Sequence, residues 1–252
     1  MIHFVGAGSG GADLITVRGA RLLGEADCII YAGSLVNPDV LQYKSQHCAV
    51  YDSAGMTMED VIALMAENEK AGKTTVRLHT GDPSLYGAIR EQMDALDERG
   101  YAYDVTPGVS AFSGAAAALE AEYTLPDVSQ SVIITRMAGR TPVPEKEKLS
   151  LMASHGCTMV LFLSTGLLEE VERELQEGGY AADTPAAIVY KATWPEEKVF
   201  RCTVGTLAQT ARENHVTKTA LITVGGFLGD RYTRSKLYDP GFTHGCRQGT
   251  EG

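Results

Sequence analysis

The sequence is poor in the features that mark secreted, metal-binding, membrane-spanning or nucleic-acid-binding proteins. Its five cysteines are scattered, with no CxxC pair or Cys/His cluster of the kind that binds zinc. No apolar run approaches the roughly 20 residues of a membrane helix, and no signal segment is visible at the start. The net charge is −10, whereas a general nucleic-acid-binding protein presents clustered Lys and Arg to phosphates. We therefore expect a cytoplasmic protein with reduced thiols, no metal site, and no nucleic-acid or membrane partner.

Short β-branched or apolar runs alternate with helical periodicity, which indicates βα units around mainly parallel sheets. The fold class predicted from this pattern is α/β. The first half contains predicted strands at 2–5, 28–31, 49–51, 75–79 and 103–105 and predicted helices at 14–23, 58–71 and 84–99. The second half contains predicted strands at 131–135, 158–163, 186–190, 198–202 and 219–224 and predicted helices at 145–153, 166–177 and 206–213.

Two α/β domains and a tail are expected along the chain. The stretch 121–130 loses helical periodicity and contains Pro126, so we place the boundary there, with domains at 1–122 and 123–229. Residues 230–252 are polar and glycine-rich and are expected to form a loosely packed extension. The runs around Val189 and Phe200, separated by Trp194-Pro195, predict an antiparallel hairpin.

A glycine motif follows the first predicted strand. Gly6, Gly8 and Gly11 satisfy G-x-G-x-x-G, which is typical of a dinucleotide-binding turn and equally of a tight strand-to-helix turn. A nicotinamide site usually has an acidic residue at the end of the second strand, to hold the ribose. That strand ends in Tyr31-Ala32-Gly33, which argues against a nicotinamide cofactor.

Two further loops also lie between a strand and a helix, where open α/β sheets bind ligands. The first is HTGDPSLYG, residues 79–87, and the second is TPGVSA, residues 106–111. Asp82 could bind a ribose hydroxyl, an amine or a helix N-terminus; the alternative is simple helix capping, with Pro83 at the first helical position. The three loops can converge on one crevice.

Six segments together carry a resemblance that runs nearly end to end. They are VGAGSGGADLITVRGARLL, YAGSLV, GDPSLYGA, PGVSAFSGAAAAL, TRMAGRTPVPE and KTALITVGGFLG, and they resemble the tetrapyrrole methyltransferase family. The resemblance implies a homodimer whose chains have the class III methyltransferase-like, tetrapyrrole methylase fold, with S-adenosylmethionine in a cleft between two α/β domains. It also implies methylation of a ring carbon of a corrin precursor, with S-adenosylhomocysteine as the second product.

The resemblance also implies which residues bind the cofactor. Carried over position by position, these are Ser9, Thr80, Gly81, Asp82, Leu85, Ser110, Ala111, Leu163, Ala192, Ala220 and Leu221. Ser9 departs from the family, because many members have proline there. This difference could loosen the turn but removes no required polar group.

Methyl transfer from a sulfonium is an in-line displacement, so the protein mainly has to align the reacting atoms and needs no nucleophile. Side chains have only to orient the ring, stabilise developing charge or accept a proton. The candidates for these catalytic roles are Asp82, Tyr86 and Lys191. The alternatives are core packing for Tyr86 and a solvated cation for Lys191.

A corrin precursor carries several carboxylates, which a protein of net negative charge can bind only through a local cationic patch. Arg136 and Arg140 flank a glycine-bearing loop and are the substrate-binding candidates, because Arg grips carboxylates in a bidentate way. The alternative is that one of them pairs with Glu145 or Glu147. Other activities also fit the sequence. They are methylation of uroporphyrinogen or of another precorrin carbon, a diphthine methyltransferase, a ribosomal-RNA methyltransferase, which the acidic charge disfavours, and a noncatalytic tetrapyrrole-binding protein.

Overall fold

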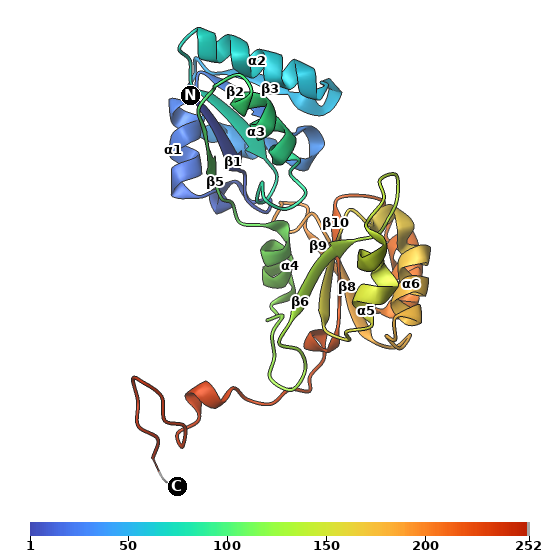
Figure 1. The fold of residues 1–252 in the computed structure, drawn as a ribbon. Coiled ribbons are helices and arrows are strands. Elements are labelled where there is room, and N and C mark those ends of the chain that lie inside the picture. Colours follow the sequence, from blue (N-terminus) through green and yellow to red (C-terminus); the bar gives the residue numbers. More distant parts are fainter. Residues whose placement is uncertain (251–252) are drawn as a thin grey trace. The chain divides into compact units, whose positions relative to one another are not determined.

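The computed structural model describes residues 1–250, which form two compact α/β units (Figure 1). Unit 1 comprises Met1–Ala118 and Lys191–Lys198, and unit 2 comprises the remaining residues. Each unit contains one five-stranded sheet. The predicted α/β class is therefore confirmed. No helix in the described range is long and apolar enough to cross a membrane.

Unit 1 is built on a parallel sheet with strand order β3-β2-β4-β1-β5. Its strands agree with the sequence prediction to within one residue: β1 Ile2–Gly6, β2 Cys28–Tyr31, β3 Ala49–Asp52, β4 Thr75–His79 and β5 Tyr103–Thr106. Because β4, β1 and β5 are neighbours, the loops that follow them leave the same edge of the sheet side by side.

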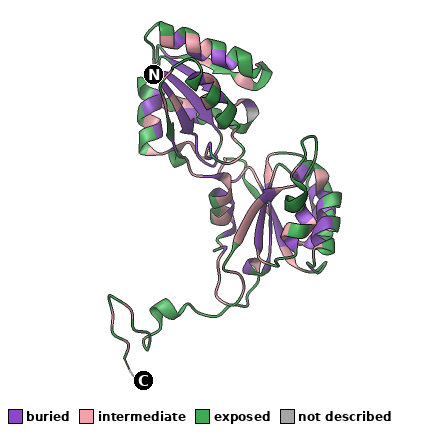
Figure 2. Ribbon diagram, in the orientation of Figure 1, coloured by how far each residue is buried: buried purple, intermediate pink, exposed green. Residues whose placement is uncertain are grey.

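Helices cover both faces of this sheet, and the central strands β2, β4 and β1 are mostly buried between them (Figure 2). The helices are α1 Val17–Glu25, α2 Met58–Lys70 and α3 Ile89–Asp97. A fourth helix, α4 Ala111–Leu119, follows β5 at the unit boundary. Successive strand residues point to opposite faces, so Val5 packs with Leu23 of α1 while Phe4 packs with Met65 of α2. The predicted start of α2 is confirmed, because Thr57 forms a capping box with Asp60.

Three predicted helix starts were wrong, each for a local reason. The helix predicted from residue 84 begins at Ile89, because Tyr86 and Ala88 have left-handed φ values of 57° and 49°. The helix predicted from residue 14 begins at Val17, because the preceding Thr16 is extended and its side chain caps the helix. The helix predicted at 145–153 is divided by Lys148 (ψ 137°) into a 3-10 turn and α5, Leu149–Ala153.

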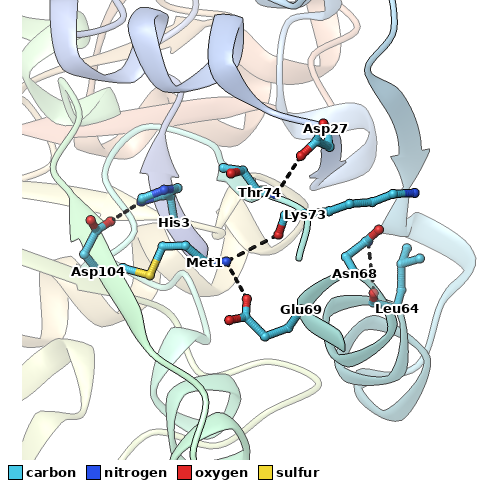
Figure 3. Close-up of polar contacts among 9 residues, drawn as sticks. All are labelled: Met1, His3, Asp27, Leu64, Asn68, Glu69, Lys73, Thr74 and Asp104. Atoms are coloured by element: carbon cyan, nitrogen blue, oxygen red, sulfur yellow. Dashed lines mark hydrogen bonds and ion pairs between the residues drawn. The ribbon is translucent and has the colours of Figure 1, made fainter. Parts of the chain in front are cut away.

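The amino-terminal edge of the unit 1 sheet is held by polar contacts within the chain (Figure 3). The amino group of Met1 pairs with Glu69 at the end of α2. His3 Nδ1 lies 2.8 Å from the Asp104 carboxylate, which joins β1 to β5. Asp27 accepts a hydrogen bond of 2.8 Å from the backbone N–H of Thr74. This edge is stabilised internally, and the candidate site residues of unit 1 lie at the opposite, carboxyl edge.

Unit 2 has a mixed sheet with strand order β6-β7-β10-β8-β9. β6 and β7 are parallel, whereas β10 is antiparallel to β7 and to β8; the predicted neighbourhood of β8 and β9 is confirmed. An apolar cluster packs one face of the sheet against helices α5, α6 and α7, and Leu149, Val171 and Leu207 are fully buried members of it. The bounds are β6 Val132–Arg136, β7 Thr158–Phe162, β8 Pro185–Tyr190, β9 Lys198–Thr203, β10 Ala220–Val224, α6 Leu168–Glu177 and α7 Leu207–Glu213. Residues 230–250 are mostly exposed and contain a short 3-10 helix, Lys236–Tyr238.

Candidate active site

The loops after β1, β4 and β5 are joined to one another by hydrogen bonds at the carboxyl edge of the unit 1 sheet. Gly8 N–H donates to Gly81 O at 3.3 Å, and Gly81 N–H donates to Gly8 O at 2.9 Å. The third loop is joined through Gly108, whose N–H donates to Asp82 Oδ2 at 2.9 Å. The convergence predicted for these loops is therefore confirmed, and the three backbones form one connected surface.

Glycine is required where these backbones cross. A Cβ at Gly108 would lie 2.1 Å from Gly81 O and 2.8 Å from the Cα of Gly6. A Cβ at Gly6 would in turn lie 2.6 Å from the Cα of Gly108. The obstructing atoms are backbone, which cannot move aside like a side chain, so the loops can approach this closely only without side chains at these positions.

Asp82 fastens the loop after β4. Its Oδ1 accepts hydrogen bonds from the Ser84 hydroxyl and, at 2.8 Å, from the Ser84 N–H, while its Oδ2 accepts from Gly108. Burial acts to raise the pKa of this carboxyl, but the hydrogen bonds outweigh burial and lower the pKa below its ordinary value. The helix-capping alternative is wrong, because no helix begins at Pro83. The carboxylate is ionised at neutral pH and ties two loops together.

Residues from other parts of the chain contact the glycine turn of residues 6–11. Ala7 N–H donates to His79 O at 2.7 Å, and Gly11 N–H donates to the hydroxyl of Thr193 at 3.0 Å. A Cβ at Gly10 would lie 2.1 Å from Cδ1 of the Trp194 indole. A dinucleotide turn presents its amides to a pyrophosphate at the start of a helix, whereas α1 begins only at Val17. These contacts favour the tight structural turn over the dinucleotide interpretation.

The residues predicted to bind the cofactor fall into two groups. Ser9, Thr80, Gly81, Asp82, Leu85, Ser110, Ala111 and Ala192 belong to unit 1, whereas Leu163, Ala220 and Leu221 belong to unit 2. Gly81 is left-handed at φ 59°, and Ser110 and Ala192 are buried. Leu163, just after β7, combines a left-handed φ of 53° with an exposed side chain. A left-handed φ is uncommon for a residue other than glycine, and such backbone strain concentrates at ligand-binding and active sites.

The other catalytic candidates, Tyr86 and Lys191, both have left-handed backbones, with φ of 57° and 47°. Tyr86 is exposed, so the core-packing alternative for its ring is wrong. Lys191 Nζ lies 3.2 Å from Glu196 Oε1 and 4.9 Å from the centre of the Trp194 ring. These contacts hold the ammonium group in place beside the glycine turn.

The two arginines proposed to bind substrate differ in their surroundings. Arg136 donates to the backbone oxygens of Met137, Thr141 and Pro142 at 3.3, 3.1 and 2.7 Å, so it braces the loop after β6. Arg140 is exposed on that loop. The structure therefore gives Arg136 a part in shaping the loop that the sequence does not predict.

Comparison with known proteins decides the family. Residues 1–208 match the model of the Tetrapyrrole (Corrin/Porphyrin) Methylases. The chain is a tetrapyrrole methylase.

Several relatives of this tetrapyrrole methylase are similar over nearly their whole length. A cobalt-precorrin-4 C(11)-methyltransferase from Methanocaldococcus jannaschii is 49% identical, covering 98% of this chain and 96% of the relative. The enzyme of the same name from Priestia megaterium is 47% identical over 99% and 98% of the two chains. A precorrin-4 C(11)-methyltransferase from Sinorhizobium sp is 43% identical over 96% of each.

Solved structures of tetrapyrrole methylases have the same fold. The X-ray structure of a cobalt precorrin-4 methyltransferase superposes with a TM-score of 0.88 at 47% identity, covering 91% of this chain and 96% of that one. A uroporphyrin-III C-methyltransferase from Thermus thermophilus, complexed with S-adenyl homocysteine, gives a TM-score of 0.72 at 23% identity, over 90% and 92% of the two chains. The second likeness concerns the fold alone.

The sequence of this methylase did not lead us to predict that Thr193 and Trp194 contact the glycine turn. Both belong to the connection between β8 and β9, which the structure assigns to unit 1. A signal was present, because Trp194 is the single tryptophan in the chain and stands beside a proline between two predicted strands. Nothing in a local pattern, however, links this connection to a glycine turn more than 180 residues earlier.

Two buried basic side chains lie in β4, just before the connected loops. Arg77 donates to Gln92 Oε1 and Ile30 O, both at 3.2 Å, so it is engaged within the core rather than turned toward a ligand. His79 Nε2 is buried without a hydrogen-bond partner among the described residues. Burial, and then the charge of Arg77, lower the pKa of His79 to about 3. His79 is consequently neutral in the folded protein at physiological pH.

No group of three or more potential metal-ligating side chains occurs within residues 1–250.

His79 is expected to make the protein acid-sensitive. Its pKa is about 3 when folded and about 6.5 when unfolded, so the unfolded state binds the extra proton between these values. The stabilisation is fully present above pH 6.5 and is lost as the pH falls toward 3. When the pH is lowered from 7 to 5, the free energy of unfolding of the parent should fall by about 2 kcal/mol more than that of His79→Gln. Urea denaturation at the two pH values measures this difference.

The matched control for this measurement is His47→Gln, because His47 is exposed. That variant should keep the parent's pH dependence. Equal pH dependence in His79→Gln and the parent would contradict the assignment.

Proposed function

We propose that this protein transfers the methyl group of S-adenosylmethionine to C-11 of precorrin-4 or cobalt-precorrin-4, a step of cobalamin biosynthesis. The observation that carries the proposal is the 41–49% identity, over nearly the full chain, to relatives that all have this activity in their names. A uroporphyrinogen-III C-methyltransferase from Bacillus subtilis is only 30% identical, so that sibling activity is disfavoured.

The connected loops of unit 1 fit S-adenosylmethionine. Gly81 and Ala111 lie close together on these loops, since a Cβ at Gly81 would lie 3.3 Å from the Ala111 nitrogen, and the half-buried Leu85 offers an apolar contact. Thr193 and Trp194 pack against the glycine turn, which supports a donor site centred on the later loops rather than a nucleotide stretched along that turn. When bound, the donor supplies an electrophilic methyl group on a sulfonium. The proposed contacts are the eight residues of unit 1 named above, together with Leu163, Ala220 and Leu221.

The chain's part in the reaction is alignment, because the electron pair for the new bond belongs to the tetrapyrrole. Asp82 keeps the loops after β4 and β5 in register, so it serves donor binding through the backbone it fastens. The hydroxyl of Tyr86, whose side chain is exposed, and the ammonium group of Lys191 are the proposed groups for orienting the macrocycle or stabilising developing charge.

Arg140 is proposed to bind a substrate carboxylate from the loop that Arg136 braces. Arg140→Ala should raise the KM for the tetrapyrrole about tenfold, since a charge-assisted contact contributes about 1.5–3 kcal/mol, and should leave S-adenosylhomocysteine affinity unchanged. Arg136→Ala should raise the KM at least as much. The measurements are steady-state kinetics and calorimetry. Arg21→Ala, which removes an exposed Arg21–Glu25 pair, is the control; loss of S-adenosylhomocysteine binding in Arg140→Ala would refute this division of roles.

The direct test incubates the protein with isotope-labelled S-adenosylmethionine and either precorrin-4 or its cobalt form, followed by NMR of the product. A new methyl group at C-11 supports the proposal, and methylation at another carbon or of uroporphyrinogen III replaces it with a sibling activity. Failure to bind S-adenosylhomocysteine in calorimetry would favour a noncatalytic tetrapyrrole-binding protein. We also propose a homodimer in the cytoplasm, which light scattering and fractionation would test.

A further inference from the structure

The segment Lys191–Lys198, which joins β8 to β9, has an unfavourable backbone. Lys191 and Thr193 have left-handed φ values of 47° and 65°, on either side of Ala192. A left-handed conformation is a genuine outlier for a β-branched residue such as threonine. It persists only where surrounding contacts enforce it, and such residues concentrate at functional sites.

Hydrogen bonds to Thr193 enforce this conformation. Its hydroxyl lies 3.0 Å from the Ser9 hydroxyl and accepts the Gly11 N–H at 3.0 Å. Its own N–H donates to Glu197 Oε2 at 2.6 Å. Thr193 therefore bonds on one side to the glycine turn and on the other to its own segment.

The contact between the segment Lys191–Lys198 and the glycine turn is closely packed. The Ala192 carbonyl oxygen lies 2.5 Å from where a Cβ of Gly10 would be, beside the Trp194 indole. On α4, a Cβ at Gly114 would lie 2.6 Å from Ser9 Cβ and 3.2 Å from Thr193 Cγ2. These two positions need glycine so that the turn, α4 and the segment can meet. Ala192 is thus fixed against the turn that bonds to the loop after β4.

We infer that Thr193 is a positioning residue of the donor site: its hydrogen bonds to Ser9 and Gly11 hold Ala192 in the place where it contacts the donor. The inference rests on the proposed function, which assigns Ala192 to the donor. Without the Thr193 hydroxyl, the segment relaxes from its left-handed backbone and Ala192 moves relative to Gly81. Donor affinity then falls, while the tetrapyrrole contacts on the loop after β6 are untouched.

The test measures S-adenosylhomocysteine binding by calorimetry in Thr193→Val and Thr193→Ser. Valine keeps the shape but loses the hydroxyl, so the Kd should rise about tenfold, with a matching rise in the KM for S-adenosylmethionine. Serine keeps the hydroxyl and should stay within about twofold of the parent. In Thr193→Val the KM for the tetrapyrrole should rise less than the KM for S-adenosylmethionine, because Arg140 lies outside the segment although Lys191 lies within it. This difference separates positioning of the donor from general destabilisation.

Trp194 supplies a second readout, because it is the single tryptophan in the chain. Its emission should shift to the red in Thr193→Val, as the indole loosens from Gly10, and stay in place in Thr193→Ser. The matched control is Thr203→Val, which removes another hydroxyl pair, 3.1 Å to Thr206 in unit 2. That control should preserve both the Kd and the emission.

If the parent fails to bind S-adenosylhomocysteine, the proposed function fails. If the parent binds and Thr193→Val binds equally well, the positioning role is overturned. Should Thr193→Val not fold, Glu197→Ala weakens the same segment from an exposed side chain and should raise the Kd about threefold. An unchanged Kd in Glu197→Ala would then overturn the inference.

Discussion

Gly108→Ala is expected to lower the free energy of unfolding by about 3 kcal/mol or more and to abolish measurable S-adenosylhomocysteine binding. Inserting one methyl group into a well-packed region costs about 1–3 kcal/mol when side chains can shift. Here the added Cβ would meet the backbone of Gly81 at 2.1 Å and of Gly6 at 2.8 Å, so whole loops would have to separate. Urea denaturation and calorimetry measure the two effects.

The matched control is Gly55→Ala, because a Cβ at Gly55 would meet no atom within 4 Å and its φ is not left-handed. This variant should change stability by less than about 1 kcal/mol. Normal ligand binding by Gly108→Ala would show that the three loops do not have to cross this closely for the site to form.

Asp82→Ala should weaken S-adenosylhomocysteine binding at least tenfold and destabilise the protein by about 2–3 kcal/mol. The substitution leaves the Gly108 and Ser84 N–H groups without their charged acceptor, and hydrogen bonds to charged groups contribute about 1.5–3 kcal/mol. The folded pKa lies below the ordinary value, so this stabilisation is present above the unfolded pKa of about 4 and is lost in stronger acid. Calorimetry and urea denaturation at pH 7 are the measurements.

Asp52→Ala distinguishes this effect from loss of a simple turn. Asp52 accepts a hydrogen bond of 2.8 Å from the Ala54 N–H, two residues along its own turn. Its loss should cost less than about 1 kcal/mol and leave the ligand affinity unchanged. Similar binding by Asp82→Ala and the parent would remove Asp82 from the donor site.

Much of the secondary structure could be predicted because its signals are local. Five β-branched or apolar runs in the first half form the five strands of one sheet, and the Thr57–Asp60 pair forms a capping box. The failures occurred where backbone conformation overrides periodicity. Residues 84–88 have a helix-compatible pattern, but Tyr86 and Ala88 are left-handed. They follow Asp82, which accepts a hydrogen bond from the distant Gly108 N–H, a contact that local periodicity does not encode.

The candidate site was predictable only in part. Loops at the carboxyl ends of neighbouring strands can be inferred from strand order, so the meeting of the Gly8, Gly81 and Gly108 loops followed from the sequence. The partners of individual atoms could not be inferred. Arg136 donates its hydrogen bonds to backbone oxygens, and Trp194 packs against Gly10 of the glycine turn. Residue spacing does not encode these contacts, because side-chain direction depends on tertiary packing.

Because Lys191–Lys198 belongs to unit 1, the chain passes between the units at residues 118–119, 190–191 and 198–199. An excised fragment ending at residue 118 would therefore lack the threonine and the indole that cover its glycine turn. A single nick between residues 191 and 198 would divide the covering segment into two pieces, each attached to the chain at one end only. The two halves of this enzyme are consequently inseparable by simple truncation, and an autonomous first half would need that short peptide spliced back onto it.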